Sequence, residues 1–498
     1  MVNFFESILY LIKKLFKKRN RSLTENTLWG IYGEFFSRAI KFMQLILIAN
    51  YLSVEGMGLF NYSIATAGML SVFYDFGILV VATKNNTQAA THGNLAPYFL
   101  LKCLTSTIGF LIFIILLSVG FVQNENTSVI VILVASVIVS DIANLILASY
   151  RSKKDFQKEA KFRSLVIIAQ FLASGLVLLF NGDLRAVSYS LLIVNIICLY
   201  PLVRLLVINH KNFLTNASSK LKLIFVECIP FAGMVMVGAL YTNIDVLLLG
   251  YFFGMSEVGI YAVAMKFVLG LIIVPITFIQ NAQIPDLVAH NDYDEKNISA
   301  LYYDWLIGYQ KTVLFGYLLC LVFAIFSEYI IFWTFGFEFK ESVNMLVSLT
   351  IVGISYYLYT PLITLFIITK KVKYSFYGQL ICCVVNLILL LWLIPIYGIY
   401  GAVVSSIVTH LIIFLILFFT SKAVFPNLFS ARATSKIFSR LFVFILLIFV
   451  MKYANIQNLI DATFFKIIIS SVFLIYTKND ILCLCSDLSG TLKRLIKN

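Results

Sequence analysis

Long runs of apolar residues, separated by short polar segments, dominate this chain between residues 28 and 482. Each run is roughly 18 to 25 residues long, the length that an α-helix needs to cross a bilayer, whereas membrane-spanning strands are shorter and alternate in polarity. The pattern predicts about fourteen transmembrane helices. Their predicted bounds are 28–51, 58–82, 96–121, 129–149, 164–181, 186–207, 223–250, 257–280, 303–327, 342–369, 374–394, 399–421, 437–454 and 464–482.

The composition supports the same fold class. Hydrophobic residues make up 61% of the 498 residues, charged residues make up 12%, and the mean hydropathy is +0.94. Soluble domains do not have this balance, so we predict an all-α polytopic membrane protein. The net charge of +14 does not indicate a nucleic-acid partner, because the basic residues fall in short loops between the apolar runs.

The basic residues also predict the orientation. With a cytoplasmic N-terminus, 29 of the 38 Lys and Arg residues lie on the cytoplasmic side, three lie outside and six lie within spans. This asymmetry favours cytoplasmic N- and C-termini. We expect residues 1–27 to form a basic amphipathic helix on the membrane surface, or alternatively a disordered basic tail, and residues 483–498 to form a cytoplasmic tail.

A short motif occurs twice. The segment LSVEGMGLF at residues 52–60 is similar to FGMSEVGIY at residues 253–261, and each copy links a long span to the next. Six predicted spans separate the copies, so the halves enter the membrane in the same sense, unless the similarity of two glycine-containing turns is chance. The repeat predicts an N-lobe at 28–207, a cytoplasmic linker at 208–222 and a C-lobe at 223–421, each lobe with six helices. A terminal helix pair at 437–482 stands outside the repeat.

The first span carries charges at membrane depth. Glu34, Arg38, Lys41 and Gln44 follow one another at helical spacing, which places them on one stripe of a helix. A charge at the bilayer centre costs on the order of 3 kcal/mol, so this stripe is expected to face a polar cavity. Cations in the wall of a cavity favour an anionic cargo. The alternative is a Glu34–Arg38 ion pair that holds helices together and leaves Lys41 as the unpaired cation.

Later spans add further candidates for the wall of the cavity. These are Lys102, Tyr241, Asp245, Lys266 and Lys311. Lys266 lies about ten residues inside its span, too deep to reach the interface easily, whereas Lys102 and Lys311 lie closer to the cytoplasmic face. Asp245 is alternatively a solvated residue near the outer interface. Asp141, on the fourth span, fits interhelical hydrogen bonding as well as it fits transport.

The deep cations point to the chemistry of the cargo. A diphosphate or an acidic sugar would complement Arg38, Lys41 and Lys266, and Arg38 is the first candidate because arginine binds phosphate in a bidentate manner. We predict no catalytic residues and no metal site, since the Cys483-Leu-Cys485 pair has no neighbouring ligand. No phosphate-binding loop of the form GxxxxGK[ST] occurs, so we expect no cofactor. Energy would come from an H⁺ or Na⁺ gradient or from consumption of the product.

Several features together resemble a known family. The Leu52–Phe60 turn, the stretch IDVLLLGYFFGMSEVGIYAVAMK around Asp245–Tyr261 and the IPIYGIYG stretch at 394–401 are similar to the polysaccharide-type flippases of the multidrug/oligosaccharidyl-lipid/polysaccharide exporter superfamily, which include the Wzx O-antigen flippases. The resemblance implies alternating access of two lobes around a cationic cavity. The implied cargo is an undecaprenyl-diphosphate-linked oligosaccharide, of O-antigen or capsule type, that crosses the bacterial inner membrane.

The resemblance also implies partners. These are the lipid-linked oligosaccharide, membrane lipids, and a polysaccharide polymerase and chain-length regulator. Alternative functions are a multidrug/cation antiporter of the same superfamily and a flippase for the lipid-linked peptidoglycan precursor. A membrane glycosyltransferase or polymerase is a weaker alternative, because such enzymes need a large or carboxylate-rich loop and the longest predicted outer loop here covers only about residues 328–341.

Overall fold

The computed structural model describes residues 23–88, 95–118, 127–152, 155–209, 220–278, 298–426, 428–453, 459–478 and 480. Secondary structure within these ranges is entirely helical. The helices are α2 (Leu23–Tyr51), α3 (Val54–Tyr74), α4 (Ile78–Gln88), α5 (Ala96–Ser118), α6 (Thr127–Ser152), α7 (Phe156–Leu179), α8 (Leu184–Asn209), α10 (Leu221–Phe253), α11 (Met255–Phe278), α13 (Ile298–Ile325), α14 (Ser327–Phe335), the 3₁₀ turn η3 (Phe337–Phe339), α15 (Glu341–Ile368), α16 (Val372–Tyr397), α17 (Ile399–Val424), α18 (Ala431–Tyr453) and α19 (Leu459–Tyr476).

The helices confirm the predicted all-α polytopic fold. In the described part of the chain, 11 helices are long and apolar enough to cross a membrane, and the bent pair α3–α4 raises the number to 12. The two other helices that coincide with predicted spans are α2, which carries three charges within the predicted span 28–51, and α19, whose apolar part is shorter. Every predicted span therefore falls on one helix or on the α3–α4 pair. Residues 1–22 and 481–498 lie outside the described residues, so the basic segment and the tail stay predictions.

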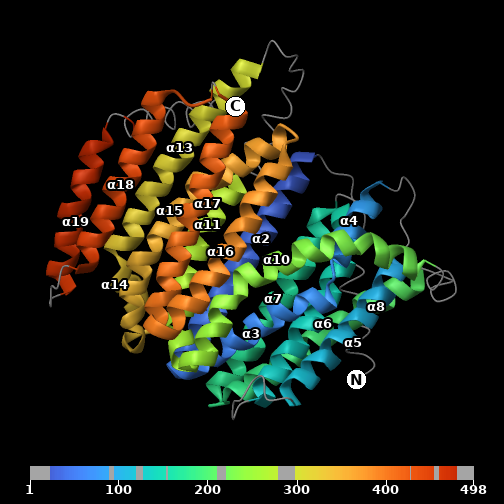
Figure 1. The fold of residues 1–498 in the computed structure, drawn as a ribbon. Coiled ribbons are helices and arrows are strands. Elements are labelled where there is room, and N and C mark those ends of the chain that lie inside the picture. The colour runs from blue at the N-terminus through green and yellow to red at the C-terminus, as the bar shows by residue number, and fades with distance from the viewer. Residues whose placement is uncertain are drawn as a thin grey trace. The chain divides into compact units, whose positions relative to one another are not determined.

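The chain divides into two compact units, Met1–Gly259 and Ile260–Asn498. In the first unit, α2 packs along α7, α6 packs along α8 and α3, and α10 packs along α3 and α4 (Figure 1). Small residues allow the α3–α10 contact: Gly68 of α3 faces Asn243 of α10, and Gly250 of α10 faces Tyr62 of α3. The helix α10, which opens the predicted C-lobe, is therefore part of the first compact unit. The lobes defined by the repeat stay a prediction.

The second predicted span is broken in its middle. The axes of α3 and α4 differ in direction by 58°. Phe76 and Gly77 link them with positive φ angles of 48° and 76°, and a Cβ at Gly77 would lie 2.6 Å from the Cβ of Phe231. Glycine is required there by both the backbone angle and the close approach. The Tyr74 carbonyl, which the break releases, accepts a hydrogen bond of 2.9 Å from Thr105 Oγ1.

In the second unit, α15 is the central helix. It packs against α13, α17 and α18, while α16 packs along α17 and α19 lies against α13 and α18 (Figure 1). The core of this second unit is rich in aromatic side chains, such as Tyr317, which contacts Phe444 and Phe473. An ion pair of 2.9 Å joins Lys466 of α19 to Glu328 of α14.

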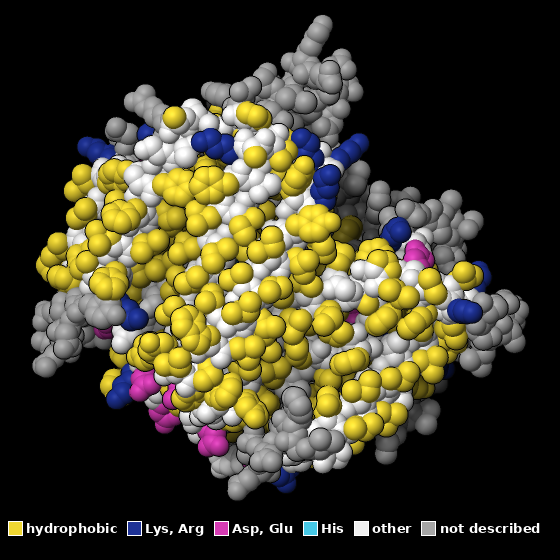
Figure 2. Space-filling view, in the orientation of Figure 1, with side chains coloured by type: hydrophobic (Ala, Val, Ile, Leu, Met, Phe, Trp, Pro, Cys, Tyr) yellow, Lys and Arg dark blue, Asp and Glu magenta, His cyan; other side chains and the backbone are white. Residues whose placement is uncertain are grey.

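The surface is that of a protein surrounded by lipid. Hydrophobic side chains cover most of the visible face, and charged side chains gather at its margins (Figure 2). Large apolar side chains are exposed singly and in rows along the helices; Trp333, for example, is 92% exposed and Phe180 is 83% exposed. Such exposure would be costly in water, so it supports placement of these helices in hydrocarbon.

Candidate functional site

The charged cluster of the first span is built at the contact between α2 and α7. Gly33 of α2 faces Ala160 of α7 so closely that a Cβ on Gly33 would lie 2.6 Å from the Cβ of Ala160. This close approach of the two backbones lets the neighbouring charged side chains reach across the interface. Glu34 of α2 thereby meets Arg163 of α7, with 3.3 Å between Glu34 Oε2 and Arg163 Nη1.

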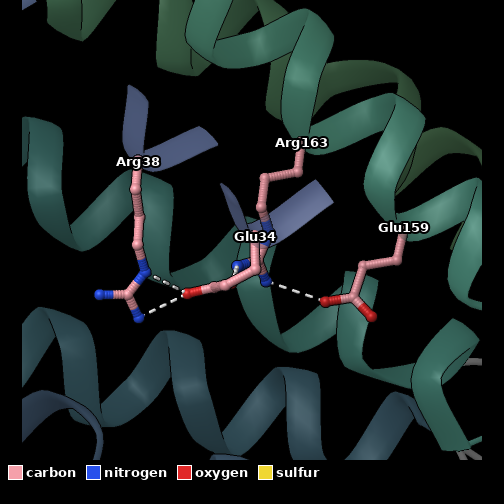
Figure 3. A network of polar contacts seen from close by, with 4 residues as sticks. All are labelled: Glu34, Arg38, Glu159 and Arg163. Carbon is pink, nitrogen blue, oxygen red and sulfur yellow. Dashed lines mark hydrogen bonds and ion pairs between the residues drawn. The ribbon is translucent and has the colours of Figure 1, made fainter. Parts of the chain in front are cut away.

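Glu34 lies between two arginines (Figure 3). Arg38 donates from Nε to Glu34 Oε1 at 2.7 Å, and its Nη2 lies 2.6 Å from the same oxygen. On the other side, Arg163 Nη2 lies 2.8 Å from Glu159 Oε1. The predicted Glu34–Arg38 ion pair is therefore present and is extended by two residues of α7. The pairing holds the Arg38 guanidinium in a defined orientation.

The two cations of α2 remain accessible. The Arg38 side chain is 51% exposed, and within the described residues its Nη1 nitrogen has no partner. Lys41, one turn further along, is exposed, and no ion pair or hydrogen bond joins its side chain to a residue that the structure describes. Arg38 and Lys41 thus offer N–H donors on neighbouring positions of one helix.

Gln44 has a different environment from the other members of the stripe. Its Nε2 donates to Ser174 Oγ of α7 at 3.1 Å, and its side chain is buried. Gln170, one turn from Ser174, donates to Asn195 of α8 at 2.7 Å, and Asn195 donates to Ser136 Oγ of α6 at 2.9 Å. Gln44 therefore begins a ladder of hydrogen bonds through four helices, and its contacts are with protein.

Lys102 is fully buried in the first unit. Its Nζ lies 2.6 Å from Asp75 Oδ1 at the α3–α4 break, contacts Asp141 of α6, and lies 5.4 Å from the ring centre of Tyr74. The exposed fractions of the side chains are 0% for Lys102, 14% for Asp75 and 21% for Asp141. The structure therefore brings Lys102 and Asp141, which come from different predicted spans, into one cluster separate from Arg38.

The remaining predicted cavity residues lie on three other helices. Tyr241 is half-buried and Asp245 is buried on α10, where Asp245 Oδ1 accepts a hydrogen bond of 2.8 Å from the Val246 backbone. Lys266 on α11 and Lys311 on α13 are half-buried in the second unit. The structure therefore divides the predicted set between its two units.

Sequence reasoning missed Arg163 and Asp75. Arg163 lies just outside the predicted span 164–181, although Glu159 and Arg163 have the spacing of a helical ion pair. Asp75 is the single charged residue of the predicted span 58–82 and lies two residues before Gly77, which together would have indicated a polar position at a helix break. Among the described residues, no group of three or more His, Cys, Asp or Glu side chains could hold a metal ion.

The fold is shared with known transporters. The lipid II flippase MurJ, in an inward closed conformation, is similar over 91% of this chain and 99% of its own, with a TM-score of 0.69 and 16% identity. An outward-facing multidrug resistance MATE transporter matches 82% of this chain and 96% of its own, with a TM-score of 0.56 and 12% identity. A MOP superfamily transporter from Pyrococcus furiosus, described as having a binding pocket of reversed polarity, matches 82% of this chain and 96% of its own. Its TM-score is 0.56 and its identity is 13%. At these identities the likeness concerns the fold alone.

The family assignment comes from the sequence. No curated protein matches this chain. The model of the polysaccharide biosynthesis protein family, in contrast, matches residues 23–289, which is just over half of the chain and includes the α2–α7 charged cluster, the α3–α4 break and both copies of the repeated turn. The chain belongs to the polysaccharide biosynthesis protein family, and its fold is similar to those of the lipid II flippase MurJ and of a MATE transporter.

Proposed function

We propose that this protein is a flippase that moves an oligosaccharide linked to undecaprenyl diphosphate across the bacterial cytoplasmic membrane. The observation that carries the proposal is the pair of accessible cations on α2, Arg38 and Lys41, on a helix of a polysaccharide biosynthesis protein. Glu34 occupies the Nε and Nη2 side of the Arg38 guanidinium and leaves Nη1 for a ligand. A diphosphate offers several oxygens to these donors, and its negative charge complements the positive charges of Arg38 and Lys41.

The energetics of such a cargo agree with this arrangement. Each sugar hydroxyl costs several kcal/mol to place unpaired in hydrocarbon, so the head group needs a polar path while its polyprenyl chain stays in lipid. Arg38 and Lys41 supply an attachment point for the charged end of the head group. Tyr241, Asp245, Lys266 and Lys311 remain candidates for other parts of that path.

The packing of the two repeated turns supports alternating access. Gly58 and Gly259 occupy the same position in the two copies, and they lie against each other. A contact between equivalent positions is expected of pseudo-symmetric halves that rock about a common axis. The peptidoglycan-precursor flippase alternative shares the diphosphate chemistry and is supported by the similarity to MurJ, whereas the family assignment favours a polysaccharide repeat unit. A cation antiporter is less well supported, because the accessible charges of α2 are positive.

The test measures transfer of a lipid-linked oligosaccharide in proteoliposomes, together with surface polysaccharide in cells that depend on this protein. Arg38→Ala and Lys41→Ala should each reduce transfer at least tenfold, while Arg38→Lys, which keeps the charge, should retain part of the rate. Arg185→Ala, at an exposed position at the start of α8, is the matched control and should transfer normally. Normal transfer by both Arg38→Ala and Lys41→Ala, at unchanged protein level, would refute the assignment.

A further inference from the structure

A second charged cluster in the first unit has no role in the proposed head-group site. We propose that Asp75, Lys102 and Asp141 form a proton-binding site, which takes up and releases one proton at the break between α3 and α4. This inference goes beyond the proposed function and does not depend on the identity of the cargo.

The balance of charge in the cluster is the first argument. Lys102 is fully buried and contacts both carboxylates, with 2.6 Å to Asp75 Oδ1. One ammonium and two carboxylates carry a net charge of −1 when all three are ionised. A net charge is costly where water is largely excluded, and the side chains are exposed by only 0% for Lys102, 14% for Asp75 and 21% for Asp141. A single proton shared by the two carboxyl groups makes the cluster neutral.

The position of Lys102 favours a proton over a metal ion. Its ammonium group contacts oxygens of both Asp75 and Asp141, so it occupies the place where a cation would bind these two residues. A metal ion would have to displace the ammonium and find further oxygen ligands. A proton adds to a carboxyl oxygen and leaves the other oxygen to accept from Lys102.

The surrounding titratable groups leave this charge balance intact. Tyr74 of α3, Cys103 of α5 and Cys228 of α10 lie within electrostatic range of the cluster. Phenols and thiols ordinarily titrate at about 10 and about 8.5, so these groups are neutral in the acidic range where carboxyl groups change charge. Glu227 of α10 is matched by Lys84 of α4, with 3.7 Å between Oε1 and Nζ.

The site is placed where a change of charge can alter the backbone. Asp75 follows the last residue of α3, and its backbone N–H donates to the Ser71 carbonyl at 2.8 Å. Through Lys102 it ties the α3–α4 break to α5, and Asp141 adds α6 to the same cluster. A proton on one carboxyl weakens its attraction to Lys102 and thereby loosens the break, so proton binding and the bend are linked equilibria. If the proposed flippase function holds, this linkage supplies a proton-dependent step in the transport cycle.

The test is difference infrared spectroscopy of the full-length protein in liposomes, with its aspartate carboxyl groups labelled with carbon-13 and with no lipid-linked sugar present. The pH is lowered from about 8 to about 5, a range that spans the ordinary protonation of carboxyl groups in proteins. We expect a carbonyl band of a buried protonated carboxylic acid that shifts with the label. Asp75→Asn and Asp141→Asn should each abolish this band, because either change leaves one carboxylate matched by one ammonium.

Two control variants identify the source of the band. Asp245→Asn removes another buried carboxyl of the first unit, and Asp183→Asn removes an exposed one, so neither should change the band. Absence of a label-sensitive band in the wild type would overturn the proposal, whether or not the variants fold. Its persistence in Asp75→Asn or Asp141→Asn, or its loss in Asp245→Asn alone, would overturn it as well. A protein that binds the proton and flips no lipid would refute the proposed function and leave this inference standing.

Discussion

Gly58 and Gly259, 201 residues apart, each lie against the backbone of the other's turn. A Cβ on Gly58 would lie 1.7 Å from the Met255 carbonyl oxygen, and a Cβ on Gly259 would lie 2.3 Å from the Val54 carbonyl oxygen. Val54 and Met255 are themselves equivalent in the two copies of the repeated turn. The contact is therefore reciprocal between equivalent positions of the two copies. It places the starts of α3 and α11 in direct backbone contact.

Replacement of Gly58 by alanine should destabilise the protein. The new methyl group has no space beside the Met255 carbonyl, and forced shifts of this kind cost about 1–3 kcal/mol. We expect a lower melting temperature in detergent than for the wild type. The control is Gly238→Ala on α10, where a Cβ meets no atom within 4 Å and alanine favours the helix by up to about 1 kcal/mol. Equal melting temperatures of the two variants would contradict a tight Gly58–Gly259 contact.

Asn195→Leu should loosen the first unit. Asn195 accepts from Gln170 and donates to Ser136, so the substitution leaves two polar side chains on α7 and α6 without this partner. Interhelical hydrogen bonds in membranes contribute up to about 1–2 kcal/mol, and a loss of this size would lower the melting temperature. Ser190→Ala, on the same helix, removes a hydroxyl that donates to the Val187 carbonyl of its own helix and should have little effect. A larger effect of Ser190→Ala would argue against the ladder.

The Lys466–Glu328 pair should be coupled in a double-mutant cycle. The Lys466 side chain is 6% exposed, so Lys466→Met leaves the Glu328 carboxylate in a largely buried site without its cation. Removal of one partner of a buried pair costs about 3–5 kcal/mol, whereas Lys466→Met combined with Glu328→Gln should cost much less than the sum of the single changes. Thermal unfolding of the four proteins measures this coupling. Additive effects would mean that the pair does not stabilise the α14–α19 contact.

The two ends of α15 should lie on opposite sides of the membrane. In a variant without native cysteines, a membrane-impermeant maleimide added to intact cells should label Glu338→Cys and not Lys373→Cys. Both positions are exposed, and the basic turn at Lys373 is expected inside because cytoplasmic loops are enriched in Lys and Arg. Permeabilised cells, in which both cysteines should react, provide the control. The reverse pattern in intact cells would overturn the predicted orientation.

Local features of the sequence determined much of what the structure contains. The length of each apolar run sets where a helix can cross the bilayer, because the hydrocarbon core has a fixed thickness, and every predicted span coincides with a helix or with the α3–α4 pair. The spacing of Glu34 and Arg38 likewise determined their ion pair, because residues four apart are neighbours on a helix.

Only the tertiary structure decided which helices meet. Arg163 contacts Glu34, which lies 129 positions away in the sequence. The contact forms because Gly33 and Ala160 let α2 and α7 approach closely. The hydropathy pattern does not indicate this contact. Asp75 and Lys102 likewise come together only through packing. Within a bilayer the lipid is as apolar as the helices, so small residues and buried polar groups select the partners of a helix, and a hydropathy pattern records only that the helix enters the membrane.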